Sequence, residues 1–259
     1  MSKKLQRYIE KQPQIPDGFQ YKTCIQVSDS KGYTLRNACL RNDFPLETWC
    51  ISGATTETLV DLINSRIRKA VTRHYKIIIY LWAGTCDLTI KERKFLKLKY
   101  KNNRAVDHIV DQYKRAIKID NKYQNAEIKF IDCPLLSIRH WNKNKGHPKP
   151  EKFKVDNFII TRQIQELNYK IWEINDQLNK TSVKISKYYF RGRKRKGGKT
   201  RKSVNLSINS KDGIHPGRLL SLAITKHILL DTYTECFDII QESEIVQIRV
   251  EQDELSSLF

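Results

Sequence analysis

An aspartate and a histidine three residues apart, Asp212 and His215, lie in a turn that opens an apolar stretch near the end of the chain. Gly213 and Pro216 mark the turn. This spacing allows the carboxylate to accept the Nδ1 proton of the imidazole while Nε2 faces a substrate. Such a pair becomes a catalytic acid and base only beside a nucleophile. By themselves, the same residues also fit an ordinary turn before a helix, with Asp212 as the cap.

Three earlier segments carry small or polar residues directly after short apolar runs. They are residues 28–32, 52–54 and 84–87. Because strands and helices alternate along the chain, we expect a mostly parallel sheet with helices on both faces, in which ligands bind beyond the carboxyl ends of the strands. These segments and the Asp212–His215 turn are therefore expected at one edge of the sheet.

Hydrophobic periodicity predicts the elements that must position these segments. We expect strands at residues 23–27, 48–51, 76–82, 127–132 and 182–190, and helices at 55–75, 105–123, 156–179 and 218–230. The continuous apolar run at 76–82 is typical of a central strand covered on both faces. The sequence thus predicts an α/β fold with three layers, α/β/α, around a mostly parallel central sheet of about five strands.

The helix expected at residues 156–179 has apolar side chains at alternating spacings of four and three residues. This pattern fits a coiled-coil seam, and it fits equally a helix docked on a sheet. We favour the docked helix, because a coiled coil requires about three to four heptads and this pattern is shorter. Self-association through residues 156–180 is the alternative.

The length and composition of the chain favour one domain. With 259 residues, of which 39% are hydrophobic, the chain can bury a single sizeable core. Residues 1–20 are expected to form a flexible arm, residues 21–230 the domain, and residues 231–259 an acidic tail. The charged N-terminus lacks the apolar stretch of a secretory signal, and no apolar run approaches the length of a membrane span.

The charge of the chain is large and unevenly distributed. The formal net charge is +20, although residues 231–259 hold eight acids and a single base. A body this basic attracts polyanions, of which nucleic acid is the first candidate. Residues 191–202 contain no acid and are expected to form a solvated loop that binds nucleic acid, unless the loop serves solubility alone. The bases of this loop are Arg191, Arg193, Lys194, Arg195, Lys196, Lys199, Arg201 and Lys202.

The six cysteines are dispersed, without the close pairs that bind metals or form redox motifs. We therefore expect reduced thiols, an intracellular protein of the nucleus or cytoplasm, and neither a metal nor another cofactor. His140 and His147 share their spacing with no carboxylate or cysteine and are expected to face solvent. Trp141 could stack on a base or a sugar.

Four blocks of residues, taken in chain order, resemble those of the SGNH (GDSL-type) hydrolases. The blocks are Asp29-Ser30, Gly53, Gly84-Thr85-Cys86-Asp87 and Asp212-Gly213-Ile214-His215-Pro216, and the resemblance covers roughly residues 22–230. It implies that Ser30 attacks an ester carbonyl, that His215 is the general base and then the acid, and that Asp212 orients the histidine. It further implies an oxyanion hole formed by the backbone N–H groups of Ser30 and Gly53 and by the side chain at position 86.

Two positions depart from the pattern of that family. Cys86 stands in place of the oxyanion asparagine, and a thiol is a much weaker donor than an amide. Losing one oxyanion donor lowers the rate about 100- to 1000-fold. Ser28 stands where the family usually has glycine. Ser28 itself, or Cys86 paired with His215, are the alternative nucleophiles.

The leading hypothesis is an SGNH-type serine ester hydrolase that cleaves acetyl or short-acyl esters through an acyl-serine intermediate, with a basic loop for nucleic acid. The alternative is a catalytically weak or inactive scaffold of the same fold that acts as a nucleic-acid-binding or assembly protein. Such a domain in a strongly basic chain also resembles the esterase-like proteins carried by some animal retrotransposons.

Overall fold

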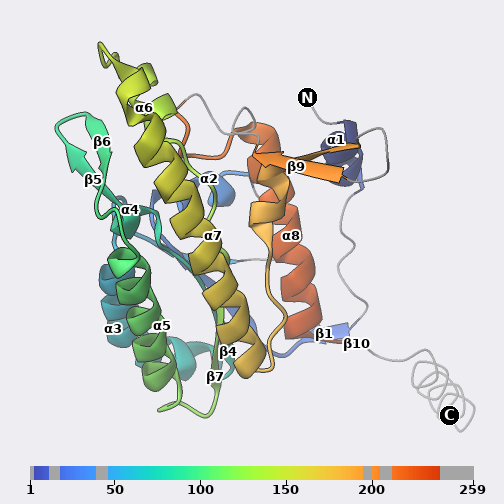
Figure 1. The fold of residues 1–259 in the computed structure, drawn as a ribbon. Helices are drawn as coiled ribbons and strands as arrows, with labels where there is room; N and C mark the ends of the chain where they lie inside the picture. Colours follow the sequence, from blue (N-terminus) through green and yellow to red (C-terminus); the bar gives the residue numbers. More distant parts are fainter. Residues whose placement is uncertain (1–2, 12–17, 39–45, 195–199, 205–211, 240–259) are drawn as a thin grey trace, which may run out of the picture.

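The computed structural model describes residues 3–11, 18–38, 46–194, 200–204 and 212–239. At its centre, four parallel strands lie in the order β3-β2-β4-β7 (Figure 1). Their bounds are Thr23–Ser28 (β2), Glu47–Cys50 (β3), Ile77–Trp82 (β4) and Ala126–Phe130 (β7). Every residue of β4 is buried, as expected for a strand covered on both faces. The predicted three-layer α/β/α fold is confirmed.

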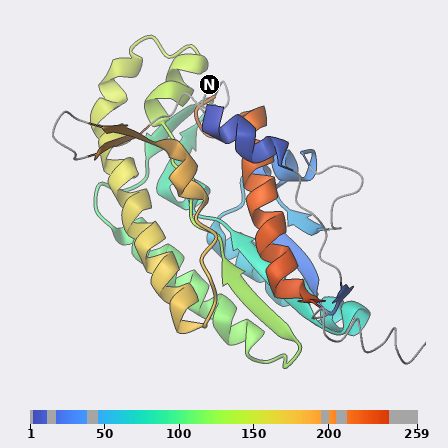
Figure 2. The ribbon, with the colours of Figure 1, turned by 90° about the vertical axis from the view of Figure 1, so that its right-hand side faces the viewer.

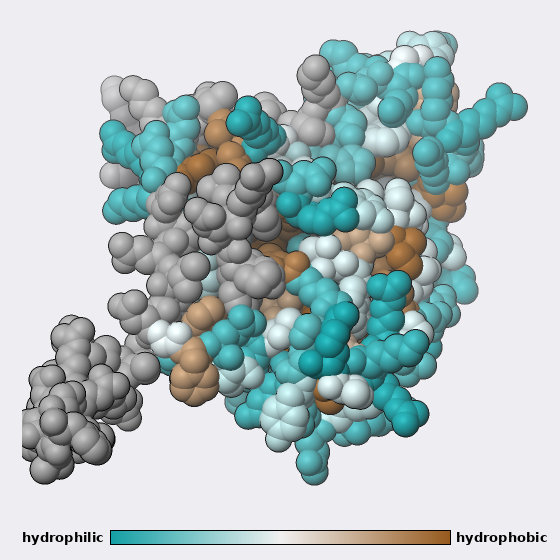
Figure 3. Space-filling view, turned by 180° about the vertical axis from the view of Figure 1, so that it is seen from behind, coloured by the Kyte–Doolittle hydropathy of each residue, from teal (hydrophilic) through white to brown (hydrophobic). Residues whose placement is uncertain are grey.

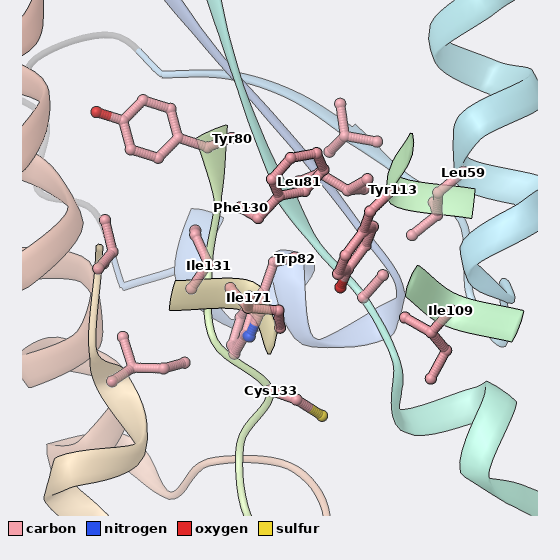
Figure 4. Close-up of a cluster of buried hydrophobic side chains, with 14 of the residues drawn as sticks. Leu59, Tyr80, Leu81, Trp82, Ile109, Tyr113, Phe130, Ile131, Cys133 and Ile171 are labelled. Atoms are coloured by element: carbon pink, nitrogen blue, oxygen red, sulfur yellow. The ribbon is translucent and has the colours of Figure 1, made fainter. Parts of the chain in front are cut away.

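Helices cover both faces of this sheet (Figures 1 and 2). Helices α3 (Thr56–His74) and α5 (Arg104–Asp120) lie on one face, and α8 (Arg218–Cys236) lies on the other. In Figure 4 the alternation along β4 serves both layers, since Tyr80 points toward α8 and Leu81 points toward α3 and α5. Tyr113 of α5 packs against Phe130 of β7, with ring centroids 4.5 Å apart.

Helix α7 (Lys154–Gln177) runs along the edge strand β7. The Asn175 side chain accepts a hydrogen bond from the Phe130 N–H (2.9 Å) and donates one to the Phe130 carbonyl (2.7 Å). Asn168 makes the same pair of bonds with Cys133, at 2.6 and 2.9 Å. The two amides therefore satisfy backbone groups that a further strand would otherwise pair. The apolar stripe of α7 is buried, which confirms the docked helix: Ile160, Ile164, Leu167, Ile171 and Ile174.

The strand predicted at residues 182–190 is wrong, and the described central sheet has four strands rather than about five. Apart from one parallel bridge between Ile131 and Val183, the segment forms the 3-10 helix η2 (Ile185–Tyr189). The cause is the buried carboxylate of Asp132. It accepts hydrogen bonds from the backbone N–H groups of Ile185 and Ser186 at 2.7 and 3.0 Å, and these bonds turn the chain away from the sheet.

Both predicted ends of the domain need correction. Residues Lys3–Glu10 form helix α1 instead of a flexible arm, and the carbonyl of Tyr8 accepts a hydrogen bond of 2.6 Å from Lys226 of α8. At the other end, α8 continues past residue 230 to Cys236. Strand β10 (Phe237–Ile239) then pairs antiparallel with β1 (Gly18–Gln20). The first part of the expected acidic tail is therefore folded, and residues 240–259 lie outside the described residues.

Short elements surround the carboxyl ends of the parallel strands. They are α2 (Ser30–Arg36), α4 (Thr85–Leu88), α6 (Ile138–Asn144), η1 (Pro150–Phe153) and the hairpin of β5 (Thr89–Glu92) with β6 (Phe95–Leu98). These elements lie at the end of the sheet that bears α6 and the β5–β6 hairpin in Figure 1. They supply the walls of the site described below.

The basic run at 191–202 differs from the solvated loop that we predicted. Strands β8 (Phe190–Lys194) and β9 (Thr200–Val204) pair antiparallel, so the run begins and ends in a two-stranded hairpin. Residues 195–199 lie outside the described part of the chain. Seen from behind, the molecule is largely hydrophilic, with hydrophobic residues in small separate groups (Figure 3). Within the described ranges, no helix has the length and apolar character needed to cross a membrane.

Candidate active site

Ser30 lies in the tight turn between β2 and α2. Strand β2 ends at Ser28, and Asp29 caps the helix by accepting a hydrogen bond of 2.9 Å from the Lys31 N–H. Ser30 is therefore the first helical residue and is half-buried at the carboxyl edge of the sheet. Gly32, in the first turn of α2, packs tightly against the end of β2, because a Cβ there would contact Cys50 Sγ and lie 2.9 Å from Ser28 Cβ.

The structure brings Ser30, His215 and Asp212 into one hydrogen-bonded chain. Ser30 Oγ lies 3.0 Å from His215 Nε2, and His215 Nδ1 lies 2.6 Å from Asp212 Oδ2. With the imidazole protonated at Nδ1, the serine hydroxyl donates to Nε2 and the histidine donates to the carboxylate. Residues 185 positions apart in the sequence thus meet with the geometry of a nucleophile, a base and an orienting acid.

Local hydrogen bonds fix the turn that carries this acid and base. Asp212 Oδ1 accepts from the backbone N–H groups of Ile214 and His215, each at 2.9 Å. Gly213 has a φ of +77°, and a Cβ there would lie 2.9 Å from the Cβ of His140. A side chain at position 213 would therefore be strained and would displace α6. The Asp212 carboxylate therefore fixes both the backbone of this turn and the orientation of the His215 imidazole.

The second and third loops are joined to each other by Asp87. Its carboxylate accepts hydrogen bonds from the backbone N–H of Thr56 at 3.0 Å and from the Thr56 hydroxyl at 2.8 Å. This contact fixes the start of α3. Gly53 lies three residues before Thr56, in the loop that leads into this helix. Burial raises the pKa of Asp87, and the Thr56 donors act in the opposite direction. Gly53 has a φ of +73° and lines the same pocket as Ser30.

Cys86 lines this pocket, but its side chain does not supply the strong hydrogen-bond donor that an asparagine would supply. Its thiol points to Asp29, with Sγ 3.9 Å from Oδ2. Burial, and next the charge of Asp29, raise the pKa of Cys86 to about 12, so the thiol stays protonated and cannot act as a thiolate nucleophile near neutral pH. The other alternative, Ser28, is fully buried and its hydroxyl has no hydrogen-bond partner among the described residues. Both observations favour Ser30.

A buried lysine lies beneath the nucleophile turn. The Lys31 side chain is 1% exposed, forms an ion pair with the equally buried Asp29, and donates a hydrogen bond of 2.9 Å to Thr85 Oγ1. Burial by itself lowers the pKa of Lys31, but the Asp29 carboxylate together with the nearby thiols of Cys86 and Cys133 outweighs burial, so the pKa lies above its usual value. Lys31 thus joins the first loop to the third.

The pocket at the triad has a volume of about 370 Å³. Apart from the triad pair Ser30 and His215, its walls include Gly53, Cys86 and three side chains that the sequence analysis did not assign to the site: Lys31, Lys91 and Trp141. Trp141 is buried against the hairpin, and its ring centroid lies 6.5 Å from that of His215, so it forms a wall of the pocket. Lys31 and Lys91 carry no sequence signal that separates them from other lysines.

Among the described residues, the other residues predicted to be functional do not line this pocket, apart from Trp141. His140 is exposed and His147 half-buried beside Phe95 and Phe153. No group of three or more residues suited to holding a metal ion occurs in the described part of the chain. The basic residues of the β8–β9 hairpin are placed by their backbone alone, and Arg195, Lys196 and Lys199 lie outside the described residues.

No protein-family model matches the sequence, and no curated protein matches it. The fold does match solved structures. The lipase/acylhydrolase from Enterococcus faecalis superposes with a TM-score of 0.50 and 12% identity, over 85% of this chain and 99% of that chain. A Bacteroides fragilis protein whose structure is described as that of an acylhydrolase superposes with a TM-score of 0.52 and 13% identity, over 89% and 96% of the two chains.

Similarity at this level of identity defines the fold. The chain shares the fold of these two acylhydrolases, which agrees with the architecture that the resemblance implied. The four sequence blocks supply Ser30, Gly53, Cys86 and His215 among the residues that line the pocket.

Proposed function

We propose that this protein is a serine ester hydrolase that cleaves an acetyl or short-acyl ester through an acyl-serine intermediate. The observation that carries the proposal is the hydrogen-bonded chain from Ser30 through His215 to Asp212 at the wall of a pocket. The fold shared with acylhydrolases supports it. The pocket is of a size that accepts a small acyl group and part of its alcohol.

In the proposed reaction, Ser30, His215 and Asp212 each act in two steps, formation of the acyl-serine and its hydrolysis. Ser30 Oγ attacks the ester carbonyl carbon while its proton moves to His215 Nε2, and the carbonyl oxygen becomes an oxyanion. Asp212 stabilises the imidazolium. When the oxyanion collapses, the C–O bond to the alcohol breaks and the leaving oxygen takes the proton from Nε2. Water then attacks the acyl-serine with His215 as base, releasing the carboxylic acid and restoring Ser30.

The oxyanion would be stabilised by the backbone N–H groups of Ser30 and Gly53. Cys86 would contribute little, because its thiol is a weak donor and points toward Asp29. A slow hydrolase is therefore expected, with two strong donors where the family has three.

Hydrolysis of 4-nitrophenyl acetate by the full chain tests the proposal. We expect Ser30→Ala to lower kcat/KM by about 1000-fold or more, because the nucleophile is lost. Ser28→Ala is the matched control from the same turn and should retain activity, since its buried hydroxyl does not reach the base. Equal rates for the wild type and Ser30→Ala, or no rate above the uncatalysed background, would reject the enzyme.

The position of Cys86 allows a test by gain of activity. Cys86→Asn introduces the amide donor that the family has there, and we expect kcat to rise by about tenfold or more, with less effect on KM. Ser52→Ala, at a neighbouring position of the same pocket wall, is the control and should leave kcat near the wild-type value. A fall in kcat for a folded Cys86→Asn variant would show that this side chain does not face the oxyanion.

Nucleic-acid association is the second proposed activity, and it is also the function of the alternative scaffold without catalysis. It rests on the run of eight bases in residues 191–202, whose ends pair as a hairpin. Binding to a short RNA or DNA duplex should weaken steeply with salt, and it should be lost when Arg193 and Arg201, which face each other in the register, are both changed to glutamine. Unchanged binding by this variant would exclude the hairpin as the contact.

A further inference from the structure

One strand pair places a lysine at the wall of the candidate active site. In the β5–β6 hairpin, Lys91 lies opposite Leu96, and both line the pocket together with Thr89. Ile90 lies opposite Lys97, and neither lines it. Because successive residues of a strand point to opposite sides, the hairpin has an inner face toward the pocket and an outer face away from it.

Helix α6 holds this hairpin in place. The Asn142 side chain accepts a hydrogen bond from the Leu96 N–H and donates one to the Leu96 carbonyl, both at 2.8 Å. The indole N–H of Trp141 donates to the Lys94 carbonyl at 3.0 Å. These bonds join β6 to the helix whose Trp141 lines the same pocket. The inner face that carries Lys91 is therefore part of a fixed wall.

The charged side chains at the pocket differ in their partners. Asp29 is neutralised by Lys31. Asp212 keeps its charge beside the neutral imidazole, and its oxygens face His215 Nδ1 and the N–H groups of its own turn. Lys91 is exposed and forms no ion pair among the residues that the structure describes. Lys145 does not line the pocket, but its Nζ lies 4.8 Å from the centroid of the Trp141 ring. A substrate that approaches Ser30 along the hairpin therefore meets the ammonium group of Lys91.

We propose that Lys91 selects esters that carry a negative charge beside the scissile bond, as a carboxylate or a phosphate. This inference rests on the proposed hydrolase function and names the class of its substrate. The cation attracts the charged substrate and holds it against the inner face of the hairpin. Because Lys91 is exposed to solvent, the pair contributes modestly and responds to salt.

The experiment compares charged and neutral esters on wild type, Lys91→Gln and Lys97→Gln. Phenyl acetate and 4-acetoxybenzoate differ by one charge on the alcohol side, and 4-nitrophenyl butyrate and mono-4-nitrophenyl succinate differ by one charge on the acyl side. Lys97→Gln is the matched control, because Lys97 lies on the outer face of the same hairpin and pairs with Glu92. Inorganic phosphate, added as a competitor, tests whether a phosphate group binds at the same place.

We expect Lys91→Gln to lower kcat/KM for the charged member of one pair by about fivefold, mainly through KM, and to change the neutral member by less than about twofold. Salt should raise KM for the charged ester in the wild type but not in Lys91→Gln. Equal changes for charged and neutral esters, or equal effects of Lys91→Gln and Lys97→Gln, would overturn the inference while leaving the hydrolase intact. An absence of Ser30-dependent hydrolysis of all four esters would overturn both.

Discussion

Lys31 and Lys129 are both buried lysines, yet they lie in different surroundings. Lys31 is 1% exposed and faces one carboxylate, that of Asp29, which is itself 1% exposed. Lys129 on β7 is 0% exposed and faces two carboxylates of α8, Asp231 and Glu235, each 15% exposed. The first pair is closed off from water, whereas the acids of the second reach the surface.

The two ion pairs also join different parts of the fold. Lys31 connects the nucleophile turn to the loop after β4, through its hydrogen bond to Thr85. Lys129 connects a strand to a helix, and Glu235 is shared with Lys180. A buried charge with a single charged partner is stabilised by that partner alone. In a network that reaches solvent, several groups share the stabilisation, so the loss of one costs less. Lys31 is therefore a positioning residue for the site, and Lys129 stabilises the fold.

The largest effect is expected from Lys31→Met. Removing the ammonium leaves Asp29 buried without a cation, which costs about 3 to 5 kcal/mol in the free energy of unfolding. The uncompensated carboxylate, beside the pocket, would also oppose the oxyanion and lower kcat by about tenfold or more. Urea unfolding and hydrolysis of 4-nitrophenyl acetate measure the two effects.

A double variant separates charge from shape at Lys31. In Asp29→Asn with Lys31→Met, the buried charge is gone and asparagine can still cap α2, so we expect much of the lost stability and kcat to return. If the double variant is no more stable and no more active than Lys31→Met, the ammonium acts by filling space and not by neutralising Asp29.

A smaller effect is expected from Lys129→Met. Asp231 and Glu235 lose a cation, but both reach solvent and Glu235 keeps Lys180, so the free energy of unfolding should fall by about 2 kcal/mol. The rate of hydrolysis per folded molecule should not change, because this cluster lies at the β7–α8 contact and not in the pocket. A loss of kcat in the folded variant would contradict the separation between the two lysines.

Periodicity and turn residues predicted the parts of the fold that depend on local sequence. The apolar runs gave four parallel strands close to their observed bounds, and Thr55 caps α3 as its side chain suggests. The fifth strand failed because its apolar residues are compatible with η2 once Asp132 caps that segment. Helix α7 contained the indication that no strand pairs here, since Asn168 and Asn175, seven residues apart on one face, bond to the backbone of Cys133 and Phe130.

The site was predictable in part for the same reason. The Asp212–His215 spacing is local, and the family resemblance supplied its distant partner Ser30. Lys129 looks like an ordinary surface lysine in the sequence, because its carboxylate partner Asp231 lies 102 residues away. Lys31 has its carboxylate partner Asp29 two residues away, but it also donates to Thr85, 54 residues away, across two loops that only the fold brings together. Burial produced by such distant contacts leaves no periodic pattern, so the sequence alone could not distinguish these lysines.

Asp120, at the end of α5, is a buried charge that extends the comparison, since it forms no ion pair within the described ranges. The residue is 8% exposed, and its Oδ1 has no hydrogen-bond partner among the described residues. Burial, and next the charge of Glu127, raise the pKa of Asp120 to about 7, with the Ile128 N–H and Lys180 acting against them. As the pH rises, the unfolded state, with a carboxyl pKa of about 4, therefore releases this proton at a lower pH than the folded state does.

The sign of this linkage follows from the raised pKa. Between about pH 4 and pH 7 the folded protein holds more protons than the unfolded chain, so the Asp120 contribution to stability falls as the pH rises through that window. Asp120→Asn removes this loss, and at about pH 8 it should be more stable than the wild type by on the order of 1 kcal/mol, with little difference at about pH 4. Asp111→Asn, exposed on the same helix, is the control and should shift neither value. Urea unfolding at both pH values measures the difference, and equal destabilisation by Asp120→Asn at both would show that this carboxylate has a partner that compensates its burial.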